Sequence, residues 1–192
     1  MKFNNDMLRL YAVTDRHWTG EQTLYEQVRD VLMGGATCLQ LREKDLDEAS
    51  FYEEAKNIKE LCRLFDVPFI INDNVMLAKE IDADGVHVGQ DDMACVKARE
   101  ILGPDKIIGV SAHTIEEARI AKEQGANYLG VGAIFPTSSK DDAEVLGIKR
   151  LKEMTDTVDL PMVAIGGISY DNCLLLKDTG IDGIAVISAL FG

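Results

Sequence analysis

Residues 107–132 read IIGVSAHTIEEARIAKEQGANYLGVG and contain one complete β/α unit. The apolar run Ile107–Ser111 predicts a strand. Thr114-Ile-Glu-Glu117 is a capping-box pattern, which predicts that a helix begins there. Gly125 stands at the expected end of that helix, and the apolar run Tyr128–Gly132 predicts the next strand. The segment therefore predicts a strand, a helix and a second strand in succession.

Apolar runs of the same kind recur along the whole chain. Most are continuous rather than alternating, which is typical of parallel strands covered on both faces or enclosed in a barrel. Helical periodicity separates them: Leu24, Val28, Val31 and Leu32 recur at the spacing of one helix face. The predicted strands are Leu8–Thr14, Cys38–Arg42, Phe69–Asn72, Gly85–Val88, Ile107–Ser111, Tyr128–Gly132, Met162–Ile165 and Gly183–Ile187.

This alternation predicts one α/β domain over residues 1–192, a (β/α)8 TIM barrel. An open, doubly wound sheet is the competing architecture, but no GxGxxG follows the first strand. Only the short segment 188–192 follows the last strand, and a helix usually needs about three turns. We therefore expect most of the final helix to be missing. The apolar faces left uncovered would favour association into a homo-oligomer.

The composition excludes several classes of protein. Of 192 residues, 46% are hydrophobic and 28% are charged, as in an ordinary folded domain. Thirty-three acidic against 20 basic residues give a net charge of −13, which disfavours binding to nucleic acid or to an anionic membrane. No apolar run reaches the ~20 residues of a membrane span, and no signal peptide is visible, so we expect a cytoplasmic protein. The four cysteines lack zinc or disulfide spacing and predict reduced thiols.

Polar side chains follow nearly every predicted strand, at the rim where the chemistry of a β/α barrel gathers. Asp73 and Asp92 follow neighbouring strands, and two carboxylates at one rim suit Mg²⁺. The alternative role for either residue is to cap the following helix. Asp91 precedes Asp92 directly, so the sequence leaves open which of the two binds metal and which caps the helix.

Cationic and glycine-rich segments lie at the same rim. Arg42, Lys44 and Lys140 follow the second and sixth strands. They would clamp a diphosphate beside a metal site, and a solvated surface position is the alternative for each. Gly166-Gly167 and Ser188–Phe191 follow the last two strands. Many barrels hold a phosphate there through backbone N–H groups.

The histidines form no recognisable catalytic set. His87 lies inside the fourth strand and predicts a hydrogen-bonded core residue, and His17 belongs to the first loop. His113 ends the fifth strand, where both helix capping and catalysis are open. No Ser-His-Asp or Cys-His arrangement can be assembled. We therefore expect metal-supported chemistry on a phosphorylated substrate rather than covalent acyl transfer.

Six short motifs stand in a fixed order along essentially the whole chain. They are Gln40-Leu-Arg-Glu-Lys44, Ile71-Asn-Asp73, His87-Val-Gly-Gln-Asp-Asp92, Gly109-Val-Ser-Ala-His113, Pro136-Thr-Ser-Ser-Lys140 and Ala164-Ile-Gly-Gly-Ile168. In this order they resemble the thiamine phosphate synthase (thiamine-phosphate pyrophosphorylase) family. The resemblance implies a transferase of the alkyl/aryl class. Such an enzyme joins hydroxymethylpyrimidine diphosphate to thiazole phosphate and releases thiamine phosphate and pyrophosphate.

The resemblance also implies a role for individual residues. Mg²⁺ would be the cofactor, held on the diphosphate by Asp73 and Asp92, and Lys44, Ser111 and Lys140 would be catalytic. The implied substrate-binding residues are Gln40, Lys44, Asn72, Ser111 and Lys140 for the pyrimidine diphosphate, and Thr137, Ser139, Gly167, Ile187 and Ser188 for the thiazole phosphate. Arg42 is added to the first set because of its position after the second strand.

Two other functions stay open on the sequence alone. The related thiazole tautomerase shares the barrel and isomerises the thiazole without a diphosphate site. It uses a histidine at the end of the sixth strand, where Ala133 stands here. The second alternative is a non-catalytic barrel that binds a phosphate ligand.

Overall fold

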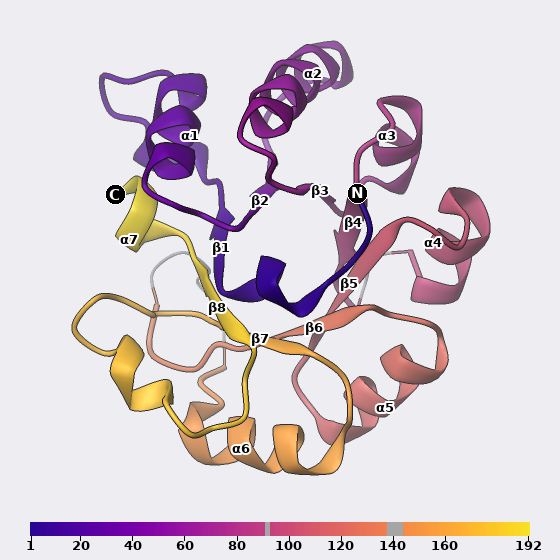
Figure 1. Ribbon diagram of the computed structural model, residues 1–192, viewed down its shortest axis with the longest axis vertical. Coiled ribbons are helices and arrows are strands. Elements are labelled where there is room, and N and C mark those ends of the chain that lie inside the picture. Colours follow the sequence, from indigo (N-terminus) through magenta and orange to yellow (C-terminus); the bar gives the residue numbers. More distant parts are fainter. Residues whose placement is uncertain (91–92, 138–143) are drawn as a thin grey trace.

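The computed structural model describes residues 1–90, 93–137 and 144–192. Eight parallel strands close into a barrel in the order β1 to β8, and helices surround it (Figure 1). The predicted (β/α)8 TIM barrel is therefore confirmed. The strands are β1 (Leu10–Val13), β2 (Cys38–Leu41), β3 (Phe69–Asn72), β4 (Gly85–Val88), β5 (Ile107–Ala112), β6 (Tyr128–Val131), β7 (Met162–Ile165) and β8 (Gly183–Val186).

The helices alternate with the strands along the chain. None of the helices that the structure describes is long and apolar enough to cross a membrane. The α-helices are α1 (Leu24–Met33), α2 (Glu48–Leu64), α3 (Val75–Glu80), α4 (Cys95–Leu102), α5 (Ile115–Glu123), α6 (Gly147–Thr157) and α7 (Ser188–Phe191). The 3-10 helices are η1 (Asn5–Leu8), η2 (Arg16–Trp18) and η3 (Cys173–Leu176). Only α7, four residues long, follows β8.

Helix ends follow a repeated local rule. The predicted capping box of Thr114 and Glu117 is present at α5, and Thr23 and Glu26 form a second one at α1. Three positions before five of the strands, one residue adopts a left-handed conformation that closes the preceding helix. These residues are Gly35, Asp66, Asp82, Gly125 and Gly180.

A second repeat joins the strands in pairs at the N-terminal end of the barrel. The residue directly before each even-numbered strand uses a side-chain oxygen to accept the N–H of a residue in the preceding odd-numbered strand. Thr37 accepts from Leu10 at 2.9 Å, and Asp84 accepts from Phe69 at 2.9 Å. Asn127 and Asp182 repeat this contact with Ile108 at 2.8 Å and Met162 at 2.9 Å. These contacts tie the eight strands together in four consecutive pairs.

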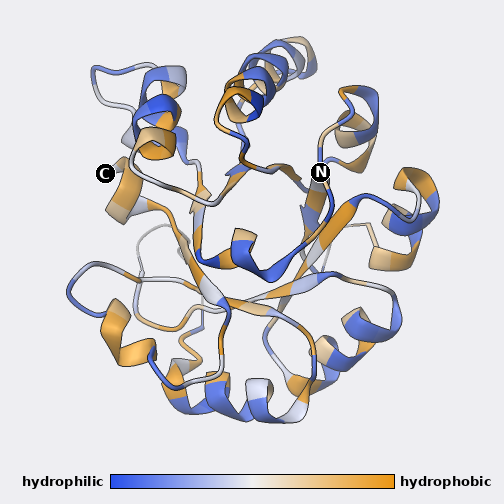
Figure 2. Ribbon diagram, viewed as in Figure 1, coloured by the Kyte–Doolittle hydropathy of each residue, from blue (hydrophilic) through white to orange (hydrophobic). Residues whose placement is uncertain are grey.

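The hydrophobic core has two parts. One lies between the barrel wall and the helices, which in Figure 2 carry both hydrophilic and hydrophobic residues, as amphipathic helices do. The other fills the barrel itself and includes Tyr11, Ile70 and Tyr128. Met7 and Leu8 join this interior part, because the indigo N-terminal segment crosses the barrel opening (Figure 1).

This N-terminal segment corrects one strand prediction. The apolar run from Leu8 to Thr14 predicted one strand, but Leu8 ends η1 and β1 begins only at Leu10. The side chain of Leu8 is fully buried. Its hydrophobicity therefore serves as a plug for the barrel rather than as a strand position.

Candidate active site

The rim at the C-terminal ends of β2 and β3 holds a compact charged cluster. The Nζ atom of Lys44 lies 2.5 Å from Oδ2 of Asp73, and Nδ2 of Asn72 donates to Oδ1 of Asp73 at 2.7 Å. The Lys44 and Asp73 side chains are 50% and 27% exposed, so a ligand can reach them. Three residues that sequence analysis selected are thus brought together.

Asp73 is held by its own backbone as well as by its neighbours. Its φ angle is +62°, in the left-handed region that Asp and Asn tolerate better than most residues. Its N–H donates to the carbonyl oxygen of His87 at 2.8 Å. The cap of α3 is Asn74, which accepts from the N–H of Leu77 at 2.9 Å. The alternative reading of Asp73 as a helix cap is therefore wrong.

Arg42 reaches the same rim from the end of β2. Its N–H donates to Oγ1 of Thr14 at 3.0 Å, which ties its backbone to β1. Its guanidinium lies 3.5 Å from the carboxylate of Asp15. Because the side chain is 28% exposed, the guanidinium is restrained and still accessible to an anion.

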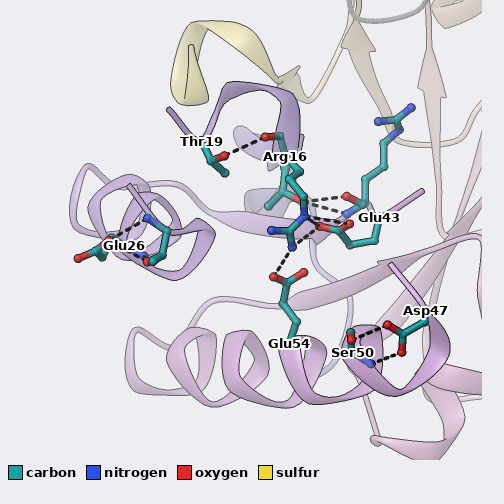
Figure 3. Close-up of polar contacts among 10 residues, drawn as sticks. Arg16, Thr19, Glu26, Glu43, Asp47, Ser50 and Glu54 are labelled. Atoms are coloured by element: carbon teal, nitrogen blue, oxygen red, sulfur yellow. Dashed lines mark hydrogen bonds and ion pairs between the residues drawn. The ribbon is translucent and has the colours of Figure 1, made fainter. Parts of the chain in front are cut away.

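Between Arg42 and Lys44 in the sequence, Glu43 joins a partly buried cluster with Arg16 and Glu54, which Figure 3 shows. Arg16 contacts Oε1 of Glu43 at 3.0 Å and Oε1 of Glu54, on α2, at 2.5 Å. The Glu43 side chain is only 2% exposed. Its burial raises its pKa, against the opposing effect of the Arg16 hydrogen bond. Sequence analysis missed this cluster, which anchors the loop that carries both cationic residues.

A polar chain crosses the barrel interior below the charged cluster. Nε2 of Gln40 donates to Oη of Tyr11 at 2.9 Å, and the hydroxyls of Tyr11 and Tyr128 are 2.6 Å apart. His87 then links Tyr128, at 3.1 Å through Nδ1, to Oγ of Ser111, at 2.9 Å through Nε2. The prediction of His87 as a hydrogen-bonded core residue is confirmed. The two tyrosines were not predicted as part of the site.

The other side of the rim is built from main chain. Gly166 and Gly167 have φ angles of +97° and +65°. A Cβ atom on Gly167 would lie 2.3 Å from the carbonyl oxygen of Pro136. Within the described ranges, no acceptor contacts the N–H groups of Gly166, Gly167 and Ile168. Free N–H groups in such a turn suit an anion.

A small cavity of about 20 Å³ brings the phosphate-side residues together, a space for about one water molecule. Its walls include Thr137 from the loop after β6, Gly167 after β7, and Ile187 and Ser188 after β8. All four were selected from the sequence. The structure therefore brings together four residues that were selected separately.

Several predicted residues cannot be placed in the same way. Asp91, Asp92, Ser139 and Lys140 lie outside the described residues. The N-cap residue of α4 is Ala94.

The remaining histidines have structural partners. His113 lies beside the capping box of α5, with its N–H donating to Oε2 of Glu117 at 2.6 Å and its Nδ1 3.3 Å from the same atom. His17 packs edge-on against the ring of Trp18.

A larger cavity of about 530 Å³ lies elsewhere, between the start of α1 and α2. Its walls include Arg16, Thr19, Tyr25, Glu54 and Asn57. None of the residues selected from the sequence lines it. Size alone therefore does not locate the site in this barrel, and the convergence of functional groups at the strand ends does.

The described donor set fits Mg²⁺ only in combination with a substrate. Mg²⁺ usually takes one or two carboxylates together with phosphate oxygens and water, and Asp73 provides one such carboxylate at the rim. In the part of the chain that the structure covers, no three His, Cys, Asp or Glu side chains gather as a metal site of their own. The four cysteines are free thiols, as predicted. The residues thus fit a substrate-bridged ion and not a structural metal.

The fold and the site place this chain among the (β/α)8-barrel enzymes. Residues 10–190 match the family model described as thiamine monophosphate synthase, and the chain belongs to this family. It is 50% identical to the thiamine-phosphate synthase of Clostridium acetobutylicum over 182 residues, 95% of this chain and 86% of that protein. The enzyme of the same name from Desulfitobacterium hafniense is 51% identical over 94% of this chain and 88% of its own length.

A solved structure supports the same assignment. The thiamine phosphate pyrophosphorylase from Pyrococcus furiosus superposes with a TM-score of 0.90 at 44% sequence identity. The match covers 98% of this chain and 89% of that one. Family membership predicted from six ordered motifs is therefore confirmed.

Proposed function

We propose that this chain is a thiamine-phosphate synthase whose two substrates bind on opposite sides of the rim. Hydroxymethylpyrimidine diphosphate takes the β2–β5 side, and thiazole phosphate takes the β6–β8 side. The observation that carries this assignment is that the rim of this family member holds two separate groups of candidate ligand-binding residues. One is the Lys44–Asp73–Asn72 cluster after β2 and β3, and the other is the glycine turn after β7. A cationic and carboxylate cluster suits a metal-bound diphosphate, and a turn of free N–H groups suits a monophosphate.

On the β2–β5 side, Lys44 and Arg42 neutralise charge on the diphosphate, with Lys140 joining them from the loop after β6. Ser111 donates its hydroxyl hydrogen to a diphosphate oxygen, while Gln40 and Asn72 orient the pyrimidine and its first phosphate. Asp73 and Asp92 would hold Mg²⁺, which supplies further neutralisation of negative charge on the leaving group. No protein nucleophile takes part.

The reaction is a substitution at the methylene carbon of the pyrimidine. The C–O bond to the diphosphate breaks with both electrons leaving on pyrophosphate, and the aminopyrimidine stabilises the methylene cation that results. The thiazole nitrogen then forms the new C–N bond. Thr137, Ser139, Gly167, Ile187 and Ser188 hold the thiazole phosphate so that this nitrogen faces the carbon. Orientation and charge neutralisation therefore supply most of the rate acceleration.

Incubation with both substrates and Mg²⁺, followed by pyrophosphate release, tests this function. We expect pyrophosphate and thiamine phosphate in equal amounts, and none when either substrate is omitted. Isomerised thiazole without pyrophosphate would instead indicate a tautomerase, although Ala133 offers no acid or base at the position where that enzyme uses histidine. Binding without turnover would indicate a non-catalytic barrel.

Two broader expectations accompany the assignment. We propose a cytoplasmic location, where both small phosphorylated substrates would be produced and used. We also propose a homo-oligomer, because apolar side chains such as Tyr170 and Leu174 are 93% and 80% exposed. Sedimentation velocity at several protein concentrations tests the second expectation, and a concentration-independent monomer would exclude it.

A further inference from the structure

Five side chains from five different strands form one continuous polar chain inside the barrel. Its order is Gln40 on β2, Tyr11 on β1, Tyr128 on β6, His87 on β4 and Ser111 on β5, with successive contacts of 2.9, 2.6, 3.1 and 2.9 Å. The two ends are residues assigned above to substrate binding. The three middle residues have no such assignment.

The barrel is shaped to hold this chain. A Cβ atom on Gly109 would lie 2.2 Å from Cζ of Tyr128 and 2.5 Å from Nδ1 of His87. A Cβ atom on Gly130 would lie 3.1 Å from Cε1 of His87. Both glycines sit in strands; Gly109 leaves no space for a Cβ atom, and at Gly130 a Cβ atom would make a tight contact with the His87 ring. The middle of the chain is also nearly dry, because Tyr11 is 1%, Tyr128 0% and His87 8% exposed.

One assignment of the hydrogens satisfies every contact of these five side chains. Each hydroxyl carries one hydrogen, and burial raises the pKa of Tyr11 and Tyr128 well above its ordinary value, so both stay protonated. Tyr11 accepts from Gln40 and can donate to Tyr128, which can donate to Nδ1 of His87. In that order Nε2 of His87 carries the ring hydrogen and donates to Oγ of Ser111.

We propose that Tyr11, Tyr128 and His87 are positioning residues that couple the orientation of the Gln40 amide to that of the Ser111 hydroxyl. Because the Ser111 oxygen accepts from His87, the hydrogen of the Ser111 hydroxyl points away from the other four side chains and toward the rim. There it donates to the leaving diphosphate. The inference rests on the proposed roles of Gln40 and Ser111 at the two ends.

Tyr128→Phe is the direct test because it removes one hydroxyl from the middle of the chain and keeps the ring. We expect kcat to fall about tenfold, as for a misdirected hydrogen-bond donor, and the KM for pyrimidine diphosphate to rise. The KM for thiazole phosphate should stay within about twofold. Tyr11→Phe removes the other hydroxyl of the Tyr11–Tyr128 contact and should change kcat and the two KM values in the same way. Tyr25→Phe, on the exposed face of α1, is the matched control.

The tautomer of His87 gives a readout that does not depend on turnover. ¹⁵N spectroscopy of the side chain should find hydrogen on Nε2 in the wild type and a mixed or changed tautomer in Tyr128→Phe. A wild-type ring protonated on Nδ1 would reverse the proposed direction and overturn the inference. So would unchanged kinetics in both folded tyrosine variants. A wild type that releases no pyrophosphate would instead contradict the proposed function.

Discussion

On the β2–β5 side of the rim, the polar groups are charged side chains drawn from separate strands, whereas on the β7–β8 side they are main-chain groups of a glycine turn. Lys44 and Asp73 meet at 2.5 Å across two strands. Gly166 and Gly167 instead depend on positive φ angles and on close contact with the Ala133–Pro136 segment. Charge can therefore be removed from the first side without altering shape. The glycine turn of the second side has no side chains, so the turn itself can be altered only through its shape.

Asp73→Asn should give the largest effect, because it removes one negative charge and keeps both the shape and the tolerance of a positive φ angle. We expect kcat to fall by about 100-fold or more, with a higher Mg²⁺ requirement and an almost unchanged melting temperature. Steady-state kinetics over a range of Mg²⁺ concentrations measures this. Asp66→Asn is a matched control at φ +55°, after α2. Wild-type turnover at limiting Mg²⁺ would remove Asp73 from the metal site.

Gly167→Ala should affect only the main-chain side. Its new Cβ would meet the carbonyl oxygen of Pro136 at 2.3 Å, so the turn must move. We expect the KM for thiazole phosphate to rise about tenfold, while the KM for pyrimidine diphosphate changes by less than about twofold. Gly103→Ala is the control, because φ is +87° there and no atom lies within 4 Å of the new Cβ. An effect mainly on the pyrimidine diphosphate would reverse the assignment of the two sides.

Glu43→Gln should give the smallest effect, a change in folding stability with pH. Glu43 anchors the loop that carries Arg42 and Lys44 on the charged side of the rim. Burial raises the folded-state pKa of Glu43 above its ordinary value. The contribution of this group to stability is therefore fully present below the ordinary pKa and is lost as the pH rises through the raised value. We expect the stability of the wild type relative to Glu43→Gln to fall as the pH rises above the ordinary carboxyl pKa and through the raised value.

Denaturant unfolding at several pH values measures this difference in stability. Glu53→Gln is the control, because Glu53 lies on α2 with an exposed side chain. A relative stability of Glu43→Gln that stays constant, or that changes in the opposite direction, would contradict the buried-carboxylate account.

The fold was predictable because its signals are local. Continuous apolar runs, the Thr114–Glu117 capping box and the glycine before each of several strands are each read within a few residues. The error at Leu8 arose because burial in a barrel plug and burial in a strand select the same residue types. Periodicity cannot separate the two.

The site was predictable only where one residue type already indicates its chemistry. Lys44, Asp73 and Gly167 stand at strand ends with recognisable roles. The tyrosine pair was not found, because Tyr11 and Tyr128 are 117 positions apart and each alone looks like a core residue. The Arg16–Glu43–Glu54 cluster was not found either, because charged residues in a loop and on a helix normally indicate solvent-exposed positions. Gly109 and Gly130 were the available signal, since glycine inside a strand often marks a close approach by another group.

The most direct test of the two-sided rim is equilibrium titration of the wild type with each substrate separately, with and without Mg²⁺. Removing Mg²⁺ should weaken binding of pyrimidine diphosphate by about tenfold or more, since the proposed site on that side includes a metal-bridged carboxylate. It should leave the affinity for thiazole phosphate unchanged within about twofold, since the groups proposed to hold that ligand are uncharged. An equal Mg²⁺ effect on both substrates, or no effect on either, would contradict the account.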